Sequence, residues 1–150
     1  MNLSSLAFEN NTPIPQKYGK DFENMNPPLS IADVPEGAKS LILFMEDPDV
    51  PESVGVPVFD HWIVFNIPPT VTNIPEKWTV EGTEGAGTRG DVGYMGPKPP
   101  DKEHRYFFTL LALNTVLDLP EGSKKEEIVK AIESHILDEV KLVGLYAPQR

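Results

Sequence analysis

The stretch HRYFFTLLALN, residues 104–114, decides the fold. Successive side chains of a β-strand point to opposite faces, so this stretch divides into two alternating sets of residues. One set starts at His104 and Tyr106, the other starts at Arg105, and both are mostly apolar over the rest of the stretch. The pattern predicts a central β-strand with two buried faces.

Two stretches closer to the N-terminus predict further core strands. SLILFME at residues 40–46 stops before Pro48, and its alternation places four residues on one face: Leu41, Leu43, Met45 and Asp47. FDHWIVFNI at residues 59–67 ends at two prolines. Its alternation places five residues on one face: Phe59, His61, Ile63, Phe65 and Ile67.

Proline and glycine dominate the segments between these strands. The chain has 16 prolines and 11 glycines, which lie between apolar runs and form no low-complexity tract. The prolines between residues 13 and 35 predict edge strands and loops and almost no helix in the N-terminal third. Residues 82–100 are rich in glycine and too long for a simple turn, and loops of that length usually carry function.

The C-terminal part predicts one amphipathic helix. Ser123 and Glu126 have the spacing of a capping box. Apolar residues then recur at helical intervals: Ile128, Val129, Ile132, Ile136 and Val140. The closing KLVGLY, residues 141–146, suggests a short strand or extended tail that brings Tyr146 back to the body of the protein.

Composition and charge restrict the class of protein. At 150 residues the chain has the size of one domain, which we expect to span residues 1–150. A net charge of -10 without any run of Lys or Arg argues against nucleic acid or an anionic membrane surface as the main partner. Because the chain has no cysteine, signal peptide or membrane-spanning apolar run, we expect a soluble cytoplasmic protein, and we expect no cofactor.

Asp47, His61 and His104 are all expected at strand ends. Asp47 closes its apolar face, whereas the two histidines come at or near the start of theirs. If the strands that carry Asp47 and His61 are antiparallel neighbours, these two side chains meet at one edge of the sheet. His104 reaches the same edge if its strand runs in the direction of the strand that carries His61.

Such a group could hold an anion. Imidazole N–H groups and the Tyr106 hydroxyl are donors that suit a phosphate or a carboxylate. An ionised Asp47 would orient the rings but repel an anion, so we expect Asp47 and the ligand to share a proton. Gly96 and Pro100 in the glycine-rich loop could form a rigid wall close to the ligand.

Other interpretations fit the same residues. A lone histidine at a strand end is more often an ordinary surface residue, and Asp-Pro-Asp is also a common turn in which Asp49 binds only backbone. Two histidines and a carboxylate form the ligand set of non-haem iron oxygenases, although the short spacings typical of metal sites are absent. A serine hydrolase would need a Gly-x-Ser-x-Gly elbow, which the sequence lacks.

The site residues lie in motifs that closely resemble the phosphatidylethanolamine-binding protein family, which includes the Raf kinase inhibitor proteins, and specifically its shorter bacterial and archaeal members. The resemblance covers most of the chain. Its motifs are DPDVP at residues 47–51, FDHW at 59–62 and GYMGPKPPDKEHRYFFTLLAL at 93–113. The sequence departs from the family at residues 101–103, where relatives often carry glycine, and at Phe59, where some members have tryptophan.

The resemblance implies a mainly β fold, an antiparallel Greek-key β-sandwich of two sheets with a C-terminal α-helix. It also implies a pocket for a phosphate-like anion such as phosphate or a phosphorylethanolamine head group. By their positions in the motifs, the residues implied to contact or surround this ligand are Asp47, His61, His104, Tyr106, Asp49, Gly96, Pro100 and Tyr146.

We therefore expect a non-enzymatic binding or regulatory protein. Its resemblance to the family allows a client kinase or serine protease, and short relatives can pair as homodimers. The alternative is a metal-dependent or general acid/base enzyme that uses the same Asp and His cluster.

Overall fold

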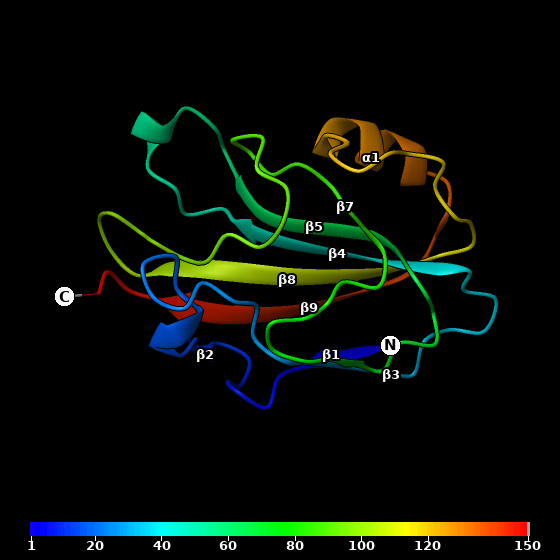
Figure 1. Cartoon of the computed structure of the whole chain (residues 1–150), viewed down its shortest axis with the longest axis horizontal. Helices are drawn as coiled ribbons and strands as arrows, with labels where there is room; N and C mark the ends of the chain where they lie inside the picture. Colours follow the sequence, from blue (N-terminus) through cyan, green and yellow to red (C-terminus); the bar gives the residue numbers. More distant parts are fainter. Residues whose placement is uncertain (150) are drawn as a thin grey trace.

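The computed structural model describes residues 1–149, which form two β-sheets and one α-helix (Figure 1). The larger sheet has the strand order β2-β9-β8-β4-β5-β7, and the smaller sheet has the order β1-β3-β6. The strands of the larger sheet are β2 (Thr12–Pro13), β9 (Ile136–Tyr146), β8 (His104–Leu113), β4 (Ser40–Asp47), β5 (Phe59–Ile67) and β7 (Thr83–Glu84). The remaining elements are β1 (Asn2–Ser4), β3 (Leu29–Ala32), β6 (Asn73–Ile74), α1 (Lys125–Ile132) and the 3-10 turns Gln16–Tyr18 and Glu52–Val54.

The predicted two-sheet β-sandwich with a helix near the C-terminus is confirmed. All strand pairs are antiparallel except the short pair of β2 with β9. The chain leaves β5, crosses to the other sheet and returns to place β8 on the opposite side of β4. As a result β4 lies between β5 and β8, and β8 is a central strand, as its sequence predicted.

The three central strands of the larger sheet, β4, β5 and β8, are buried on both faces over most of their length, which explains why they are mostly apolar. On β4, Leu41, Leu43 and Met45 contribute to a core that the smaller sheet covers, while Ile42 and Phe44 belong to a second core under α1. Figure 1 shows α1 on one side of the sheet and β1 and β3 on the other. Burial of each such side chain contributes about 1.5–3 kcal/mol to stability.

The predicted face of β5 is wrong beyond its first residues. Ile63 and Phe65 lie in the core under α1, whereas Trp62 and Val64 lie in the core between the sheets. The pairing with β4 shifts between Met45/Trp62 and Glu46/Asp60, so His61 is an extra residue on its strand. Such a β-bulge breaks the alternation of side chains. It places His61 among the residues that line a cavity with Asp47.

The predicted C-terminal helix is correct only for its first part. The α-helix ends at Ile132, and residues 136–146 form β9, which pairs with β8 along its whole length. Helical spacing of apolar residues was therefore overridden by pairing with a buried neighbouring strand. The expected cap also differs, because the Ser123 hydroxyl donates to the Pro120 carbonyl and Glu127 accepts the Lys124 amide instead.

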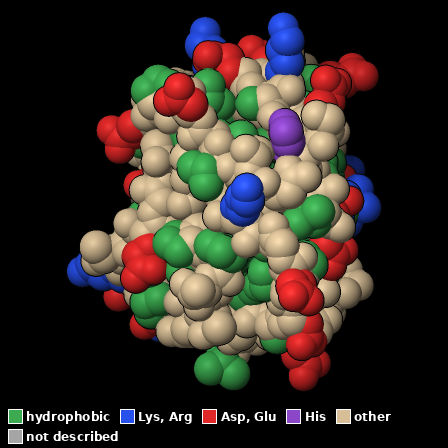
Figure 2. All heavy atoms as spheres, turned by 90° about the vertical axis from the view of Figure 1, so that its right-hand side faces the viewer, with side chains coloured by type: hydrophobic (Ala, Val, Ile, Leu, Met, Phe, Trp, Pro, Cys, Tyr) green, Lys and Arg blue, Asp and Glu red, His purple; other side chains and the backbone are tan. Residues whose placement is uncertain are grey.

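The surface at the right-hand side of Figure 1 has no large patch of one kind. Figure 2 shows hydrophobic side chains in separate groups on this face and acidic side chains mainly towards its edges. No helix within residues 1–149 is long and apolar enough to cross a membrane.

The helix is fixed to the sheet by a half-buried charge cluster. Lys125 donates from Nζ to Glu46 of β4 and, at 2.7 Å, to Oδ1 of Asp60 of β5. Burial acts to lower the pKa of the Lys125 ammonium, but the hydrogen bonds to Asp60 and Glu46 outweigh it and the pKa is raised. The ammonium therefore stays charged and compensates two carboxylates that have little access to water.

Replacement of Lys125 by methionine tests this cluster. We expect Lys125→Met to lower the free energy of unfolding by about 2 kcal/mol, because it leaves two half-buried carboxylates without a cation. Urea denaturation measures the change, and Lys130→Met, an exposed change on the same helix, should cost only a few tenths of a kcal/mol. Equal effects of the two substitutions would contradict a role for the cluster.

Candidate functional site

Three strand ends of the larger sheet meet at one edge. Asp47 is the last residue of β4 and pairs with Phe59, the first residue of β5. β4 is antiparallel to both β5 and β8, so the C-terminal end of β4 lies beside the N-terminal ends of both neighbours. The geometric condition under which Asp47, His61 and His104 converge is thus met.

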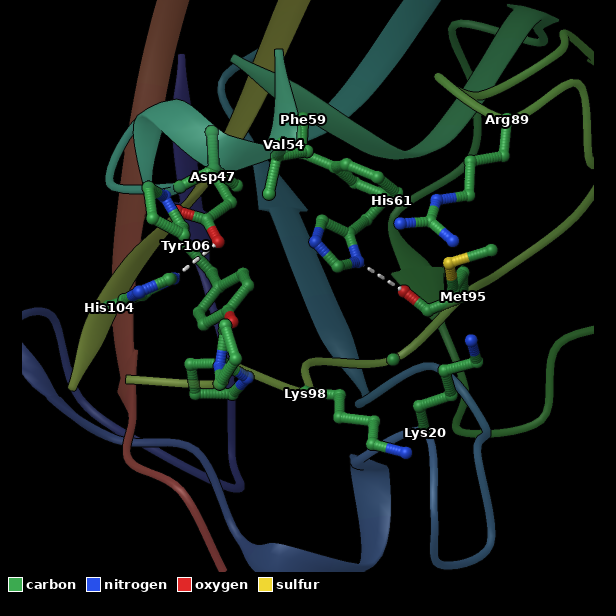
Figure 3. A pocket seen from close by; sticks show the side chains of 15 residues that line it. Lys20, Asp47, Val54, Phe59, His61, Arg89, Met95, Lys98, His104 and Tyr106 are labelled. Carbon is green, nitrogen blue, oxygen red and sulfur yellow. Dashed lines mark hydrogen bonds and ion pairs between the residues drawn. The ribbon is translucent and has the colours of Figure 1, made fainter. Parts of the chain in front are cut away.

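A cavity of about 310 Å³ lies at this edge (Figure 3). This volume is at the lower end of the range for small-molecule sites. Six of the residues predicted for the site line it: Asp47, His61, Gly96, Pro100, His104 and Tyr106. Its apolar wall includes Phe59 and Val54, which the sequence analysis did not place in the site.

His104 lies between two carboxylates. Its Nδ1–H donates to Oδ2 of Asp47 at 2.7 Å, and its Nε2–H donates to Oδ1 of Asp101 at 2.6 Å. Each ring nitrogen of His104 is thus engaged by a carboxylate oxygen. The other oxygen of Asp47 accepts the backbone amide of Asp49 at 2.8 Å. Both oxygens of the buried Asp47 carboxylate are thus hydrogen-bonded within the protein.

His61 is arranged differently, because one of its ring nitrogens is hydrogen-bonded within the protein and the other is not. Nδ1–H donates to the carbonyl of Met95 at 2.8 Å, which assigns the proton to Nδ1 because a carbonyl can only accept. Burial lowers the pKa of the His61 imidazole. The neutral ring therefore presents an unprotonated Nε2, and in Figure 3 this nitrogen faces the interior of the cavity.

Tyr106 supplies an unpaired polar atom. The residue is fully buried, and its hydroxyl has no hydrogen-bond partner among residues 1–149. Burial is also the main reason why the pKa of this hydroxyl is raised, so it remains a donor. Its ring lies edge-on to that of His61, with 5.3 Å between the centroids. Buried polar groups are nearly always hydrogen-bonded, so an unpaired hydroxyl beside a cavity marks a place for a ligand or water.

Three cationic side chains that the sequence analysis missed also line the cavity: Lys20, Arg89 and Lys98. Figure 3 shows Lys20 and Arg89 on the Met95 side of the cavity, away from Asp47 and His104. Lys98 forms an exposed ion pair with Asp21 at 3.0 Å, and the Arg89 guanidinium lies 5.7 Å from the ring centroid of Phe59. Lys20 lies in the connection between β2 and β3, and Arg89 and Lys98 are well separated within the glycine-rich loop, so no local run of basic residues indicated them.

The glycine-rich loop forms the wall that was predicted from its composition. At Gly96 a side chain would collide with the backbone of the neighbouring loop, since a Cβ would lie 2.3 Å from the Tyr18 carbonyl oxygen. Hydrogen bonds from Lys20 N to Pro97 O and from Gly96 N to Asn24 Oδ1 join the two loops. The wall is therefore held against residues 18–24.

Two of the predicted site residues lie outside the cavity. Asp49 is bound by Arg105, whose Nε and Nη2 donate to the two carboxylate oxygens at 2.9 and 2.8 Å, and this lowers the pKa of Asp49 to about 2. Tyr146 lines an adjacent cavity, and its hydroxyl donates to the Gln16 carbonyl. The Tyr146 ring still contacts the edge of Tyr106, with 6.5 Å between centroids. Both residues thus lie next to the cavity and contact residues that line it: Asp49 contacts Asp47, and Tyr146 contacts Tyr106.

No group of three or more His, Asp or Glu side chains within residues 1–149 converges as a metal-ligand set. Asp47 and Asp101 lie on opposite nitrogens of His104, so the three groups form a row and do not surround a common point. His135 lies away from the site, where its Nδ1 bonds Asn114 Oδ1 at 2.8 Å.

Comparison with known proteins agrees with this architecture. The chain is 47% identical over 152 residues to a UPF0098 protein from Methanothermobacter thermautotrophicus, an alignment that covers 97% of this chain and 98% of the relative. A UPF0098 protein from Chlamydia trachomatis is 45% identical over 147 residues, with the same coverage.

Two solved structures match this chain over nearly its whole length. The crystal structure of a phosphatidylethanolamine-binding protein homologue from Chlamydia trachomatis matches with a TM-score of 0.95 and 44% identity, covering 98% of this chain and 97% of that chain. E. coli YbcL, described as a member of the mammalian family, matches with a TM-score of 0.88 and 25% identity over 99% of this chain and 98% of its own. The phosphatidylethanolamine-binding protein family model matches residues 4–147. The chain therefore belongs to the phosphatidylethanolamine-binding protein family.

Proposed function

We propose that this protein is a non-enzymatic binding protein that holds a phosphate-like anion in the cavity at the ends of β4, β5 and β8. The observation that carries the proposal is the unpaired, buried hydroxyl of Tyr106, whose ring lies edge-on to that of His61, together with the free Nε2 of His61. Lys20, Arg89 and Lys98 give the cavity a positive rim in a chain whose net charge is -10. These features favour an anion that local geometry selects.

The proposed site couples anion binding to proton uptake. In the free protein burial keeps the pKa of His61 low, so Nε2 accepts and does not donate. A bound anion would favour the imidazolium, whose Nε2–H could donate to it, and would raise this pKa. The Asp47 carboxylate is already engaged by the His104 Nδ1–H at 2.7 Å and by the Asp49 amide, which hold it in place. His104 thus positions Asp47, and His61 and Tyr106 are the proposed ligand contacts.

The size of the cavity narrows the ligand. About 310 Å³ suits a phosphate or a phosphorylethanolamine head group and leaves little room for lipid chains. The Chlamydia trachomatis protein is described as a homologue of phosphatidylethanolamine-binding protein, and we take the head group named there as a proposed ligand of this chain. A client kinase or serine protease, a homodimer and a cytoplasmic location remain proposals from the family and the composition.

The enzyme alternative has its own observation, since the row Asp47, His104, Asp101 could move a proton. Incubation of phosphorylethanolamine with the protein, followed by 31P NMR with and without added divalent metal, separates the two functions. An unchanged spectrum apart from line shifts supports binding alone. Formation of a new phosphorus species would establish the enzyme.

Sulfate titration tests the proton coupling, because sulfate keeps its charge between pH 5 and 8. We expect calorimetry to show that sulfate affinity rises as pH falls, by up to about tenfold per pH unit between the low pKa of free His61 and its raised value in the complex. His61→Gln should abolish this pH dependence and His135→Gln should leave it intact. Affinity that does not change with pH in the unmodified protein would refute the coupling.

Removal of the Tyr106 hydroxyl tests the second proposed contact. Tyr106→Phe keeps the buried ring and should weaken sulfate binding about tenfold at pH 6, since one donor to a charged group is lost. Because the hydroxyl has no partner in the protein, the substitution should not lower the melting temperature. Tyr18→Phe is the matched control, as its hydroxyl binds Glu76 away from the cavity. Unchanged sulfate affinity in Tyr106→Phe would remove this residue from the site.

Asp101 provides a third test, because its carboxylate occupies the other nitrogen of His104. We expect Asp101→Ala to tighten sulfate binding roughly threefold to tenfold, since it removes a negative charge near the cavity and frees the His104 Nε2–H. Glu103→Ala, an exposed change in the same loop, should alter the dissociation constant less than about twofold. Weaker binding in Asp101→Ala would show that the ion pair supports the site.

A further inference from the structure

A further hollow is lined by sequence neighbours of residues that line the anion cavity. It has a volume of about 720 Å³, and its lining includes three aromatic and three acidic side chains: Trp62, Trp78, Tyr94, Glu23, Glu76 and Glu84. Neighbouring residues separate the two sites, because His61 and Met95 line the anion cavity while Trp62 and Tyr94 line this groove. We call it the aromatic groove.

The aromatic rings of this groove stand nearly perpendicular to one another. Trp62 and Trp78 meet at 87° with 6.3 Å between centroids, and Trp62 and Tyr94 meet at 83° with 5.6 Å. Trp62 is almost fully buried, whereas Trp78 and Tyr94 are partly exposed. Trp62 therefore forms the floor of the groove and the other two rings form its sides.

Hydrogen bonds fix two of these rings and the backbone of the third residue. The Trp62 indole N–H donates to Oε2 of Glu84 at 2.9 Å, and the Tyr94 hydroxyl donates to the Tyr18 carbonyl at 2.9 Å. The backbone amide of Trp78 donates to Oδ1 of Asn26, also at 2.9 Å. A groove whose walls are already fixed loses little conformational entropy when a ligand binds.

The charge of the groove is negative. Glu76 is engaged by Lys17 at 3.1 Å and by the Tyr18 hydroxyl at 2.7 Å. Glu84 is partly buried, accepts only the Trp62 indole, and has no ion-pair partner within residues 1–149. Because Lys17 compensates Glu76, two carboxylates of the lining are left to consider. These two, Glu23 and Glu84, stand against Lys77, an exposed cation of the lining. The groove thus complements a cation and disfavours an anion.

We propose that the aromatic groove binds a small organic cation that carries a quaternary ammonium group, with Glu84 as its counter-ion. Methylated ammonium groups are weakly hydrated and are attracted to the faces of Trp and Tyr rings. A quaternary ammonium group cannot donate hydrogen bonds. This suits a groove in which Oε2 of Glu84 already accepts the Trp62 indole N–H. The volume of about 720 Å³ is within the range for small-molecule sites.

Choline is the probe for this proposal, and 3,3-dimethylbutan-1-ol is its neutral control of the same shape. Trp62 and Trp78 are the 2 tryptophans of the chain and both line the groove, so tryptophan fluorescence reports on it. We expect a saturable fluorescence change with choline and at least about tenfold weaker binding of the alcohol. No saturable change with choline, or an equal response to the alcohol, would overturn the proposal.

Glu84→Gln tests the counter-ion, because glutamine keeps an oxygen that can accept the Trp62 indole. Choline binding should weaken at least about fivefold in this variant, and Glu139→Gln, an exposed change on β9, should bind choline as the unmodified protein does. The indole N–H signals of both tryptophans in NMR spectra report whether Glu84→Gln is folded. If it is not, Trp78→Leu, read through the Trp62 signal, should show the same loss, and full choline affinity in Trp78→Leu would overturn the proposal.

The two sites are distinguishable by experiment. His61→Gln should change sulfate binding and leave the choline response as it is, whereas Glu84→Gln should do the reverse. Loss of both responses in His61→Gln would show that the choline signal comes from the anion cavity and would overturn the separate groove.

Discussion

The structure depends on the position of β4 between two antiparallel neighbours. Because β5 and β8 both run against it, the end of β4 meets the beginnings of both strands at one edge of the larger sheet. Asp47, His61 and His104 converge there, although Asp47 and His104 are 57 residues apart in the sequence. The apolar faces of β4, covered by the smaller sheet on one side and by α1 on the other, keep this arrangement fixed.

The two histidines of the site have different tasks because their partners differ. Both ring nitrogens of His104 bind carboxylates, whereas His61 donates one N–H to a backbone carbonyl and keeps the other nitrogen free. Two titratable groups of one site commonly take different roles when their surroundings differ. The hydrogen bond from His104 occupies one oxygen of Asp47, and Lys20, Arg89 and Lys98 give another part of the cavity lining positive charge.

Much of this could be predicted from the sequence, and the failures have physical causes. The alternation in β4 and β8 was correct because both strands are regular and buried. The predicted alternation failed in β5, where a bulge at His61 changes which side chains point to which face. The predicted helix failed after Ile132, where pairing of β9 with β8 overrides the helical pattern. Lys20, Arg89 and Lys98 gave no signal because only the folded chain brings them together, and Asp49 gave a misleading one because its partner Arg105 was not apparent.

The central claim is that the free Nε2 of His61 acquires a proton when an anion enters the cavity. Long-range 1H–15N NMR spectra of the imidazole rings test it most directly, since they separate protonated from unprotonated ring nitrogens. The account predicts that, at pH 7, His61 Nε2 of the free protein resonates as an unprotonated nitrogen and moves towards the protonated range when phosphate is added. A His61 spectrum that stays the same at saturating phosphate would contradict it.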